Sequence, residues 1–148
     1  HEGSKKADRR VTFDRASRTV RLQQGDSAPV TLPAAADALD PVSAFYYIRA
    51  LAPAPGTVVQ LPVSDWGREM TVTVPPGSLE TIAVGGAKVE ALRLQPRVSK
   101  RDGQTAGYRL TLWISRDARR IPLVITVDGL AGVGSVRLEL ESYVAGGR

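Results

Sequence analysis

Two-residue alternation of apolar and polar side chains recurs along most of this chain, and it constrains the fold more than any other feature. Val11 and Phe13 alternate with charged and hydroxyl side chains, and the same period returns within residues 59–74, 79–94 and 108–127. Because successive side chains of a strand point to opposite faces, this period predicts half-buried β-strands. Aromatic residues make up only 5% of the chain, so the core must consist mainly of aliphatic side chains, whose β-branched members favour sheets.

Turn signals between the alternating segments predict four antiparallel hairpins. The first lies within residues 11–22, with its turn at 14–17, and the second within 59–74, with its turn at 64–67. Gly85 and Gly86 join the arms of the third, because paired glycines supply the positive φ of a tight connection. The fourth and most regular hairpin spans residues 108–127. A last strand holds Val136, Leu138 and Leu140; residues 24–38, 99–107 and 128–135 are expected to be loops, and 1–7 and 145–148 frayed ends.

One segment has helical rather than strand periodicity, and it begins at Asp40. The Asp40 carboxylate can accept a hydrogen bond from an unpaired backbone N–H, and Pro41 suits the first helical position because its missing N–H costs nothing there. The Pro-rich residues 52–56 end the helix. One apolar stripe is expected to be buried against a sheet: Ala44, Phe45, Ile48 and Leu51.

These elements predict a single domain over residues 1–148 with a mainly β fold. Seven to nine strands, with one helix after the second strand, fit a curved antiparallel sheet or an incomplete β-barrel with the helix packed on it. The length of 148 residues is that of one ordinary domain.

A second face of the helix is not explained by packing on one sheet. Val42, Tyr46 and Arg49 point away from the apolar stripe and form a partly aromatic surface. Trp113 lies on the opposite side of its strand from its apolar neighbours, where it either packs on the core or lines the rim of a hydrophobic cavity. These four residues are the candidate ligand- or partner-binding site.

The residue inventory excludes much of the usual catalytic chemistry. The chain has no Cys, and its only His is His1, so a thiolate nucleophile, a Cys-ligated metal or a His general base lacks its residue or depends on the terminus. No metal and no cofactor are therefore expected. Carboxylates remain, as the pairs Asp37 with Asp40 and Asp65 with Glu69. Asp40 is already a helix cap and Asp65 a turn residue, and without a raised pKa in an apolar pocket such a pair is not catalytic.

The basic net charge suggests nucleic acid as a partner, and the glycine-rich segment suggests a phosphate ligand. The arrangement of residues along the chain favours neither. The net charge is +5 and the pI is about 10.0, but the basic residues alternate with apolar ones along strands, which is typical of solvated faces. Nucleic acid is therefore not expected. Residues 129–134 resemble a phosphate loop only in their glycines, because a strand rather than a helix follows them. No stretch is long and apolar enough for a transmembrane segment, and no signal peptide is present in the chain.

Two motifs carry a resemblance to a known family. They are DPVSAFYYIR at residues 40–49 and LWISRDARRIPL at 112–123, with the pair Phe13-Asp14 upstream. The sequence resembles the bacterial exported domain of unknown function 3108 family over most of its length. The resemblance implies an all-β fold and a place in the periplasm or cell envelope, and it implies no established activity. Nothing before residues 9–14 matches the family's opening hairpin, so the chain is expected to start inside the domain.

The leading hypothesis is a noncatalytic envelope domain that binds an apolar small molecule or an envelope protein. The alternative is a carboxylate-dependent enzyme acting on a cell-wall or polysaccharide substrate. A closed core would favour an interaction role, a cavity lined by Val, Leu and Trp113 would favour a ligand, and paired buried carboxylates would favour the enzyme. Residues 9–14 are further expected to pair, as an edge strand, with another chain or an upstream segment, although nearby arginines could keep that edge solvated.

Overall fold

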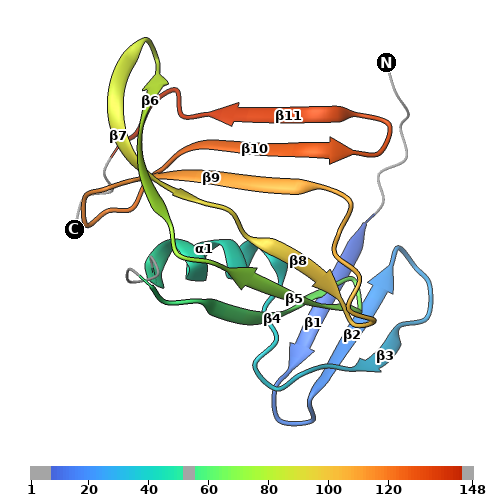
Figure 1. The fold of residues 1–148 in the computed structure, drawn as a ribbon. Coiled ribbons are helices and arrows are strands. Elements are labelled where there is room, and N and C mark those ends of the chain that lie inside the picture. The colour runs from blue at the N-terminus through green and yellow to red at the C-terminus, as the bar shows by residue number, and fades with distance from the viewer. Residues whose placement is uncertain (1–7, 52–55, 145–148) are drawn as a thin grey trace.

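The computed structural model describes residues 8–51 and 56–144, which form eleven strands and one helix (Figure 1). All of the sheets are antiparallel, so the predicted mainly β fold is confirmed, and the described strands do not close into a barrel. The elements are β1 (Arg9–Asp14), β2 (Thr19–Gln24), β3 (Val30–Pro33), α1 (Pro41–Leu51), β4 (Val59–Asp65), β5 (Arg68–Val74), β6 (Ser78–Val84), β7 (Ala87–Leu94), β8 (Arg97–Lys100), β9 (Arg109–Ser115), β10 (Pro122–Leu130) and β11 (Gly134–Glu139).

The strands are divided among three sheets. Their orders are β1-β2-β3, β4-β5-β8 and β11-β10-β9-β7-β6. All four hairpins expected from the sequence are present, as β1-β2, β4-β5, β6-β7 and β9-β10. Gly85 and Gly86 have φ of +55° and +80°, as a tight turn between β6 and β7 requires.

A sharply bent two-stranded ribbon joins the sheet β4-β5-β8 to the five-stranded sheet. Strand β5 leads into β6 and β7 leads into β8, while β5 pairs with β8 and β6 with β7. The bend falls at Pro75, Pro76 and Gly77 on one strand and at Pro96 on the other. Proline has no N–H to donate to a ladder, so pairing stops there and each arm of the ribbon joins a different sheet. A Cβ on Gly77 would lie 2.8 Å from the Arg93 carbonyl oxygen, so the bend needs a glycine.

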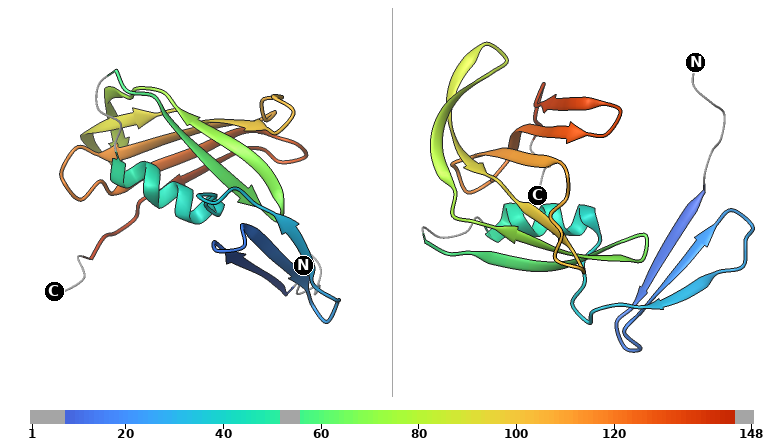
Figure 2. Two further views of the ribbon diagram at one scale, coloured as in Figure 1. Left: turned by 90° about the horizontal axis from the view of Figure 1, so that it is seen from below. Right: turned by 45° about the vertical axis from the view of Figure 1, so that its right-hand side comes forward.

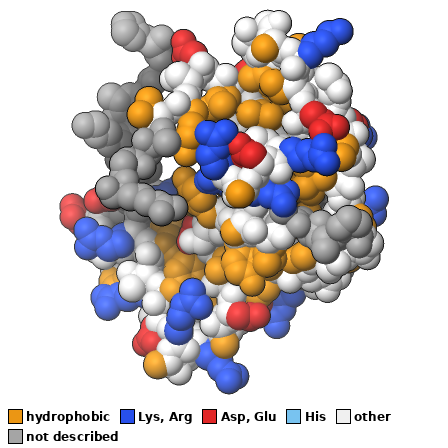
Figure 3. Space-filling model, turned by 90° about the vertical axis from the view of Figure 1, so that its left-hand side faces the viewer, with side chains coloured by type: hydrophobic (Ala, Val, Ile, Leu, Met, Phe, Trp, Pro, Cys, Tyr) orange, Lys and Arg blue, Asp and Glu red, His pale blue; other side chains and the backbone are white. Residues whose placement is uncertain are grey.

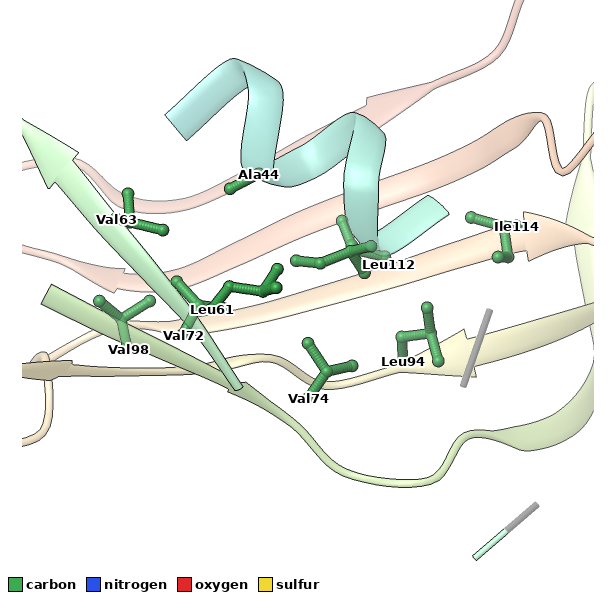
Figure 4. Close-up of a cluster of buried hydrophobic side chains, with 10 residues drawn as sticks. Ala44, Leu61, Val63, Val72, Val74, Leu94, Val98, Leu112 and Ile114 are labelled. Atoms are coloured by element: carbon green, nitrogen blue, oxygen red, sulfur yellow. The ribbon is translucent and has the colours of Figure 1, made fainter. Parts of the chain in front are cut away.

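Helix α1 lies inside the curve made by the sheet β4-β5-β8 and the five-stranded sheet (Figure 2). Asp40 caps it as expected, because its Oδ1 accepts hydrogen bonds from the backbone N–H groups of Val42 and Ser43, each at 2.9 Å. Ala44 and Ile48 are buried, whereas Phe45 is only half-buried. Strands from both sheets complete the core shown in Figure 4, through Leu61, Val63, Val72, Val74, Leu94, Val98, Leu112 and Ile114.

The three-stranded sheet β1-β2-β3 contacts the rest of the protein at the β4-β5 turn. Gly67 lies in this turn with φ of +75°, and the methyl groups of Leu22 and Leu32 approach it so closely that a Cβ there would lie 2.8 and 2.6 Å from them. The Arg9 guanidinium lies 5.2 Å from the centre of the Trp66 ring. Leu22 and Val20 are buried, so the apolar face of this small sheet is partly covered by the neighbouring hairpin.

Several sequence-based expectations were wrong in detail. Strand β3 lies within the expected loop at 24–38, so the helix follows the third strand; β8 overlaps the expected loop at 99–107. The expected loop at 128–135 is short, because β10 continues through a bulge to Leu130 and β11 starts at Gly134. Leu51 is 45% exposed although it lies on the same face as Ala44 and Ile48, because it is the last residue of α1. The expected frayed ends, His1 and most of the segment after the helix lie outside the described residues.

Candidate functional site

A cleft with an apolar base opens between the end of β8, the start of β5 and the segment that leads into β9. Its volume is about 510 Å³. Met70 and Val98 come from the core-facing sides of β5 and β8, and both contact the core or belong to it. Ala106 and Tyr108 close the cleft from the opposite side. The base of the cleft is therefore an extension of the hydrophobic core toward solvent.

Backbone hydrogen bonds hold this opposite wall in place. The Ala106 N–H donates to the Val98 carbonyl oxygen at 2.7 Å, and the Lys100 N–H donates to the carbonyl oxygen of Gln104 at 2.8 Å. A further β-bridge joins Ser99 to Thr105. The segment between β8 and β9 thus doubles back along β8, which sets Ala106 beside Val98.

The Tyr108 hydroxyl is the polar group best placed at the mouth of the cleft. Burial, and after it the negative charge of Asp65, raises the pKa of Tyr108 above its ordinary value of 10.0. The hydroxyl therefore stays protonated at physiological pH and can donate a hydrogen bond. Arg68 and Lys100 also line the mouth, together with Asp65 and Asp102, and neither of these two cations forms an ion pair with a described residue.

A second groove adjoins the cleft on the other side of Tyr108. It has a volume of about 630 Å³ and shares Val98, Ala106 and Tyr108 with the cleft. Its other walls include Leu110 and the bulge of β10, where Gly129 has φ of +81° and a Cβ would lie 2.9 Å from the Gly107 carbonyl oxygen. The two hollows therefore adjoin at Val98, Ala106 and Tyr108.

The side chains at the centre of the described core are enclosed by other residues. Leu94 and Val74 are fully buried, and Leu112 and Ile114 almost so. The cleft and the adjoining groove are open to solvent, and Trp113 lines neither of them. A cavity lined by Val, Leu and Trp113, which the sequence offered as the sign of a ligand carrier, is therefore not the form that the candidate site takes.

The residues singled out in the sequence lie elsewhere, on the outer surface of α1 and on β9. Val42 and Tyr46 are 64% and 57% exposed, as expected for a face that does not pack on a sheet. Arg49 lies beside Tyr46, with its guanidinium 5.8 Å from the ring centre. None of the three lines the cleft.

Arg49 joins the two motifs that carry the family resemblance. Its Nε donates to the Arg120 carbonyl oxygen at 2.6 Å, and its Nη2 donates to that of Arg119 at 2.9 Å. Both carbonyls belong to the turn between β9 and β10. Arg49 therefore has a structural role, because its side chain ties α1 to a turn distant in sequence.

Asp117 organises the turn that Arg49 holds. Its Oδ1 accepts hydrogen bonds from the Ser115 hydroxyl at 2.7 Å and from the Arg119 N–H at 3.2 Å, and its Oδ2 accepts from the Arg119 guanidinium. The Ser115 hydroxyl oxygen in turn accepts from the Ile121 N–H at 2.8 Å. The Ser115 hydroxyl bond, followed by that from the Arg119 side chain, lowers the pKa of Asp117. The polar groups of the second family motif, at residues 112–123, therefore form hydrogen bonds with one another.

Trp113 lies half-buried on the outer side of the five-stranded sheet, separate from the helix residues. Its Nε1 donates to the Glu80 carboxylate at 3.0 Å, and the Arg93 guanidinium, which is paired with Glu80, lies 6.0 Å from its ring centre. This arrangement packs Trp113 across three neighbouring strands. The sequence-based expectation that Trp113 belongs to a binding site with Val42, Tyr46 and Arg49 stays a prediction, but the four residues do not form one cluster.

The carboxylates of the described residues are not arranged as a buried pair. The buried polar residues are Ser64 and Thr111, with no Asp or Glu among them. Glu69 is bound by Arg101 at 3.0 Å, and Asp65 is the last residue of β4 rather than part of the turn. No cluster of three His, Asp or Glu residues with metal-binding geometry is present within residues 8–51 and 56–144.

Charged side chains are dispersed over the surface. On the face shown in Figure 3, Lys and Arg side chains lie apart from one another, with Asp and Glu and hydrophobic patches between them. Within the part of the chain that the structure describes, five arginines make ion pairs with carboxylates. None of the described helices is of the length and apolarity that a membrane crossing needs.

Sequence reasoning missed the cleft residues for a specific reason. The alternation along its strand assigns Met70 to the core, and Ala106 falls in an expected loop. Strands β5 and β8 are distant in sequence, and only their pairing brings Met70 and Val98 together at the edge of the core. Tyr108 lines the same cleft. The one signal in the sequence that points to the cleft is Tyr108, at the start of the most regular predicted hairpin.

Comparison with known proteins identifies a family and no closer relative. The model of one family, described as "Protein of unknown function (DUF3108)", matches residues 1–141. No curated protein and no solved structure matches the chain. The match covers nearly the whole chain and confirms the resemblance seen in the two motifs.

Proposed function

The chain belongs to the DUF3108 family of proteins of unknown function, and from this premise we propose that it is a noncatalytic cell-envelope domain that binds an apolar small molecule in the cleft at Tyr108. The observation that carries the proposal is the apolar base of that cleft, formed by the buried Val98 and the half-buried Met70 and Ala106. The envelope location rests on the family resemblance alone.

The chemistry of the cleft supports an apolar ligand with a polar end. Small-molecule sites commonly have volumes of about 300 to 1,000 Å³, mostly apolar walls and a few polar groups that orient the ligand. Here Met70, Val98 and Ala106 form an apolar base, and around it lie Tyr108, the cations Arg68, Lys100 and Arg101 and the carboxylates Asp65, Glu69 and Asp102. A ligand with an acyl chain and an anionic end would place the chain against Met70 and the charge near these cations.

The alternatives have less support. A carboxylate-dependent enzyme would need a carboxyl group with a raised pKa in an apolar pocket. The shifted carboxyl groups, Asp14, Asp40, Asp117 and Glu139, all have lowered pKa values, because each accepts hydrogen bonds from neighbouring groups. An envelope protein that docks on Val42 and Tyr46 stays the second candidate, because these apolar side chains are exposed on α1.

The experiment that tests the proposal is a binding titration with a fluorescent fatty acid. The variant Ala106→Trp should fill the cleft, since Ala106 lies between the cleft and the adjoining groove. We expect saturable binding to the wild-type chain and at least a tenfold loss of affinity in the variant. The matched control is Ala83→Trp, which adds the same side chain at an exposed position of β6 and should bind as the wild type does.

Two outcomes would contradict the proposal. One is a wild-type chain that binds no apolar probe, and the other is equal binding by Ala106→Trp and Ala83→Trp. Thermal unfolding of both variants shows whether a loss of binding reflects a filled cleft or an unfolded chain.

A further inference from the structure

The outer edge of β1 exposes backbone groups in a defined pattern. Within the described residues, β1 pairs only with β2, in the register that sets Arg9 opposite Gln24 and Asp14 opposite Thr19. The Gly25 N–H donates to the Asp8 carbonyl oxygen at 2.7 Å, so Asp8 and Gly25 form a hydrogen-bonded pair. Such pairs alternate along an antiparallel ladder. The N–H and C=O groups of Val11 and Phe13 therefore point away from β2, toward the free edge.

We propose that this edge pairs with β1 of a second copy of the chain, antiparallel and centred on Thr12, so that two three-stranded sheets become one six-stranded sheet. In this register Val11 of each copy lies opposite Phe13 of the other, and Thr12 lies opposite Thr12. Val11 and Phe13 carry the outward backbone groups, so the hydrogen bonds of the new ladder form between them. The inference does not depend on the ligand proposed for the cleft.

Side-chain charge selects this register from its neighbours. Arg10 of each copy meets Asp14 of the other, and opposite charges directly across a ladder are stabilising. A shift of two residues in one direction would set Asp8 opposite Asp14, and a shift in the other direction would set Val11 opposite Arg15. A shift of one residue would face outward backbone groups with inward ones, so no ladder could form. Of these registers in which a ladder forms, only the one centred on Thr12 sets an arginine of β1 opposite a carboxylate; it also sets Arg9 opposite Arg15, which lies in the turn beyond β1.

The apolar face of the sheet also gains cover in the dimer. Val11 is 38% exposed and Phe13 is half-buried, although both lie on the side of the sheet that holds the buried Val20 and Leu22. Cross-strand contact of Val11 with Phe13 of the partner would cover part of this surface. Asp14 remains able to accept a hydrogen bond from Arg10 of the second copy, because its bonds to the N–H groups of Ala16 and Ser17 use only Oδ1.

Sedimentation equilibrium of the full 148-residue chain tests the proposal by charge complementation. Arg10→Glu sets two carboxylates opposite each other across the new ladder, and Asp14→Lys sets two cations opposite each other. Each variant alone should therefore dimerise at least about tenfold more weakly than the wild type. A mixture of the two should dimerise again, since the cross-strand pairs between unlike chains no longer hold like charges. Arg21→Glu, with the same charge change on the middle strand β2, should leave dimerisation unchanged.

A second variant covers the case in which Asp14→Lys disturbs its turn. Val11→Pro removes an N–H that points to the free edge and none that binds β2, so it should prevent the dimer while the hairpin stays folded. Amide hydrogen exchange should show protection of Val11 and Phe13 that rises with protein concentration in the wild type and is lost at Phe13 in this variant. A wild-type chain that stays monomeric at every soluble concentration would overturn the proposal. So would equal dimerisation of Arg10→Glu and Arg21→Glu, or a mixture that fails to recover.

Discussion

Gly67 is the residue at which the three-stranded sheet β1-β2-β3 meets the rest of the protein. Its φ of +75° is disfavoured for other residues, and its Cα hydrogen faces the methyl groups of Leu22 and Leu32. We expect Gly67→Ala to lower the free energy of unfolding by about 1–3 kcal/mol from backbone strain, and further through the crowded methyl groups. Denaturant unfolding measures the change.

Gly86→Ala is the matched control for this prediction. Gly86 has a similar φ of +80°, but a Cβ there would meet nothing within 4 Å. The difference between the two variants therefore reports the contact between the small sheet and the β4-β5 turn. Equal losses of stability would show that this contact contributes nothing.

Asp40 makes the stability of α1 depend on pH. Hydrogen bonds from the Ser43 side chain, and then from the Ser43 and Val42 N–H groups, hold the pKa of Asp40 below its ordinary value of 3.8. A group with a depressed pKa in the folded state stabilises the fold above its unfolded pKa, and this contribution is lost as the pH falls through the folded pKa. We expect Asp40→Ala to cost about 0.5–2 kcal/mol near neutral pH.

The pH profile distinguishes this cap from other contacts of Asp40. The stability gap between the wild type and Asp40→Ala should stay constant down to about pH 3.8 and narrow below it. Urea unfolding at a series of pH values measures the gap. A gap that widens on acidification has the wrong sign for this account.

At the scale of the helix, the orientation of α1 can be tested with two neighbouring aliphatic residues. Ile48 is 4% exposed and lies in the core, whereas Leu51 is 45% exposed. We expect Ile48→Ala to cost about 2–5 kcal/mol and Leu51→Ala less than about 1 kcal/mol. Denaturant midpoints of both variants measure the costs, and the reverse order would mean that the helix is rotated from the position described.

Two hydrogen bonds from the Arg49 side chain join α1 to the β9-β10 turn. Arg49→Met keeps most of the aliphatic stem but loses both hydrogen bonds to the turn, and we expect a cost of about 1–2 kcal/mol because the bonds are partly exposed. Arg101→Met removes an exposed ion pair with Glu69 and should cost less than about 1 kcal/mol. Thermal unfolding of both variants measures the costs. Equal costs would show that the hydrogen bonds of Arg49 to the turn stabilise the protein no more than an exposed ion pair does.

At the scale of the whole molecule, the sequence predicts the elements that neighbouring residues form. It misses the strands whose position depends on pairing with distant segments. Hairpins such as β6-β7 and the cap at Asp40 follow from neighbouring residues. The short strands β3 and β8, of four residues each, carry too little alternation to be recognised. Their places depend on pairing with β2 and β5, and no local pattern encodes the order of strands in a sheet.

The candidate site shows the same limit. Val42 and Tyr46 were found because a helix period sorts residues into faces, and their exposure agrees with that sorting. The cleft was missed because it forms at the end of the β5-β8 pair that lies away from the proline bend, where the segment after β8 doubles back and sets Ala106 beside Val98. Only the pairing of distant strands and the path of this segment place these residues together.

Met70 offers the most direct measurement of the central claim, because it is the only Met in the chain and it lies in the cleft. With a ¹³C-labelled methionine methyl group, the protein gives one NMR signal that reports on the proposed site. Titration with a fatty acid should shift this signal saturably in the wild type and in Ala83→Trp, and it should leave the signal of Ala106→Trp unchanged. A methyl signal that stays fixed in the wild type while the fatty acid binds would contradict the account, because the ligand would then occupy another part of the molecule.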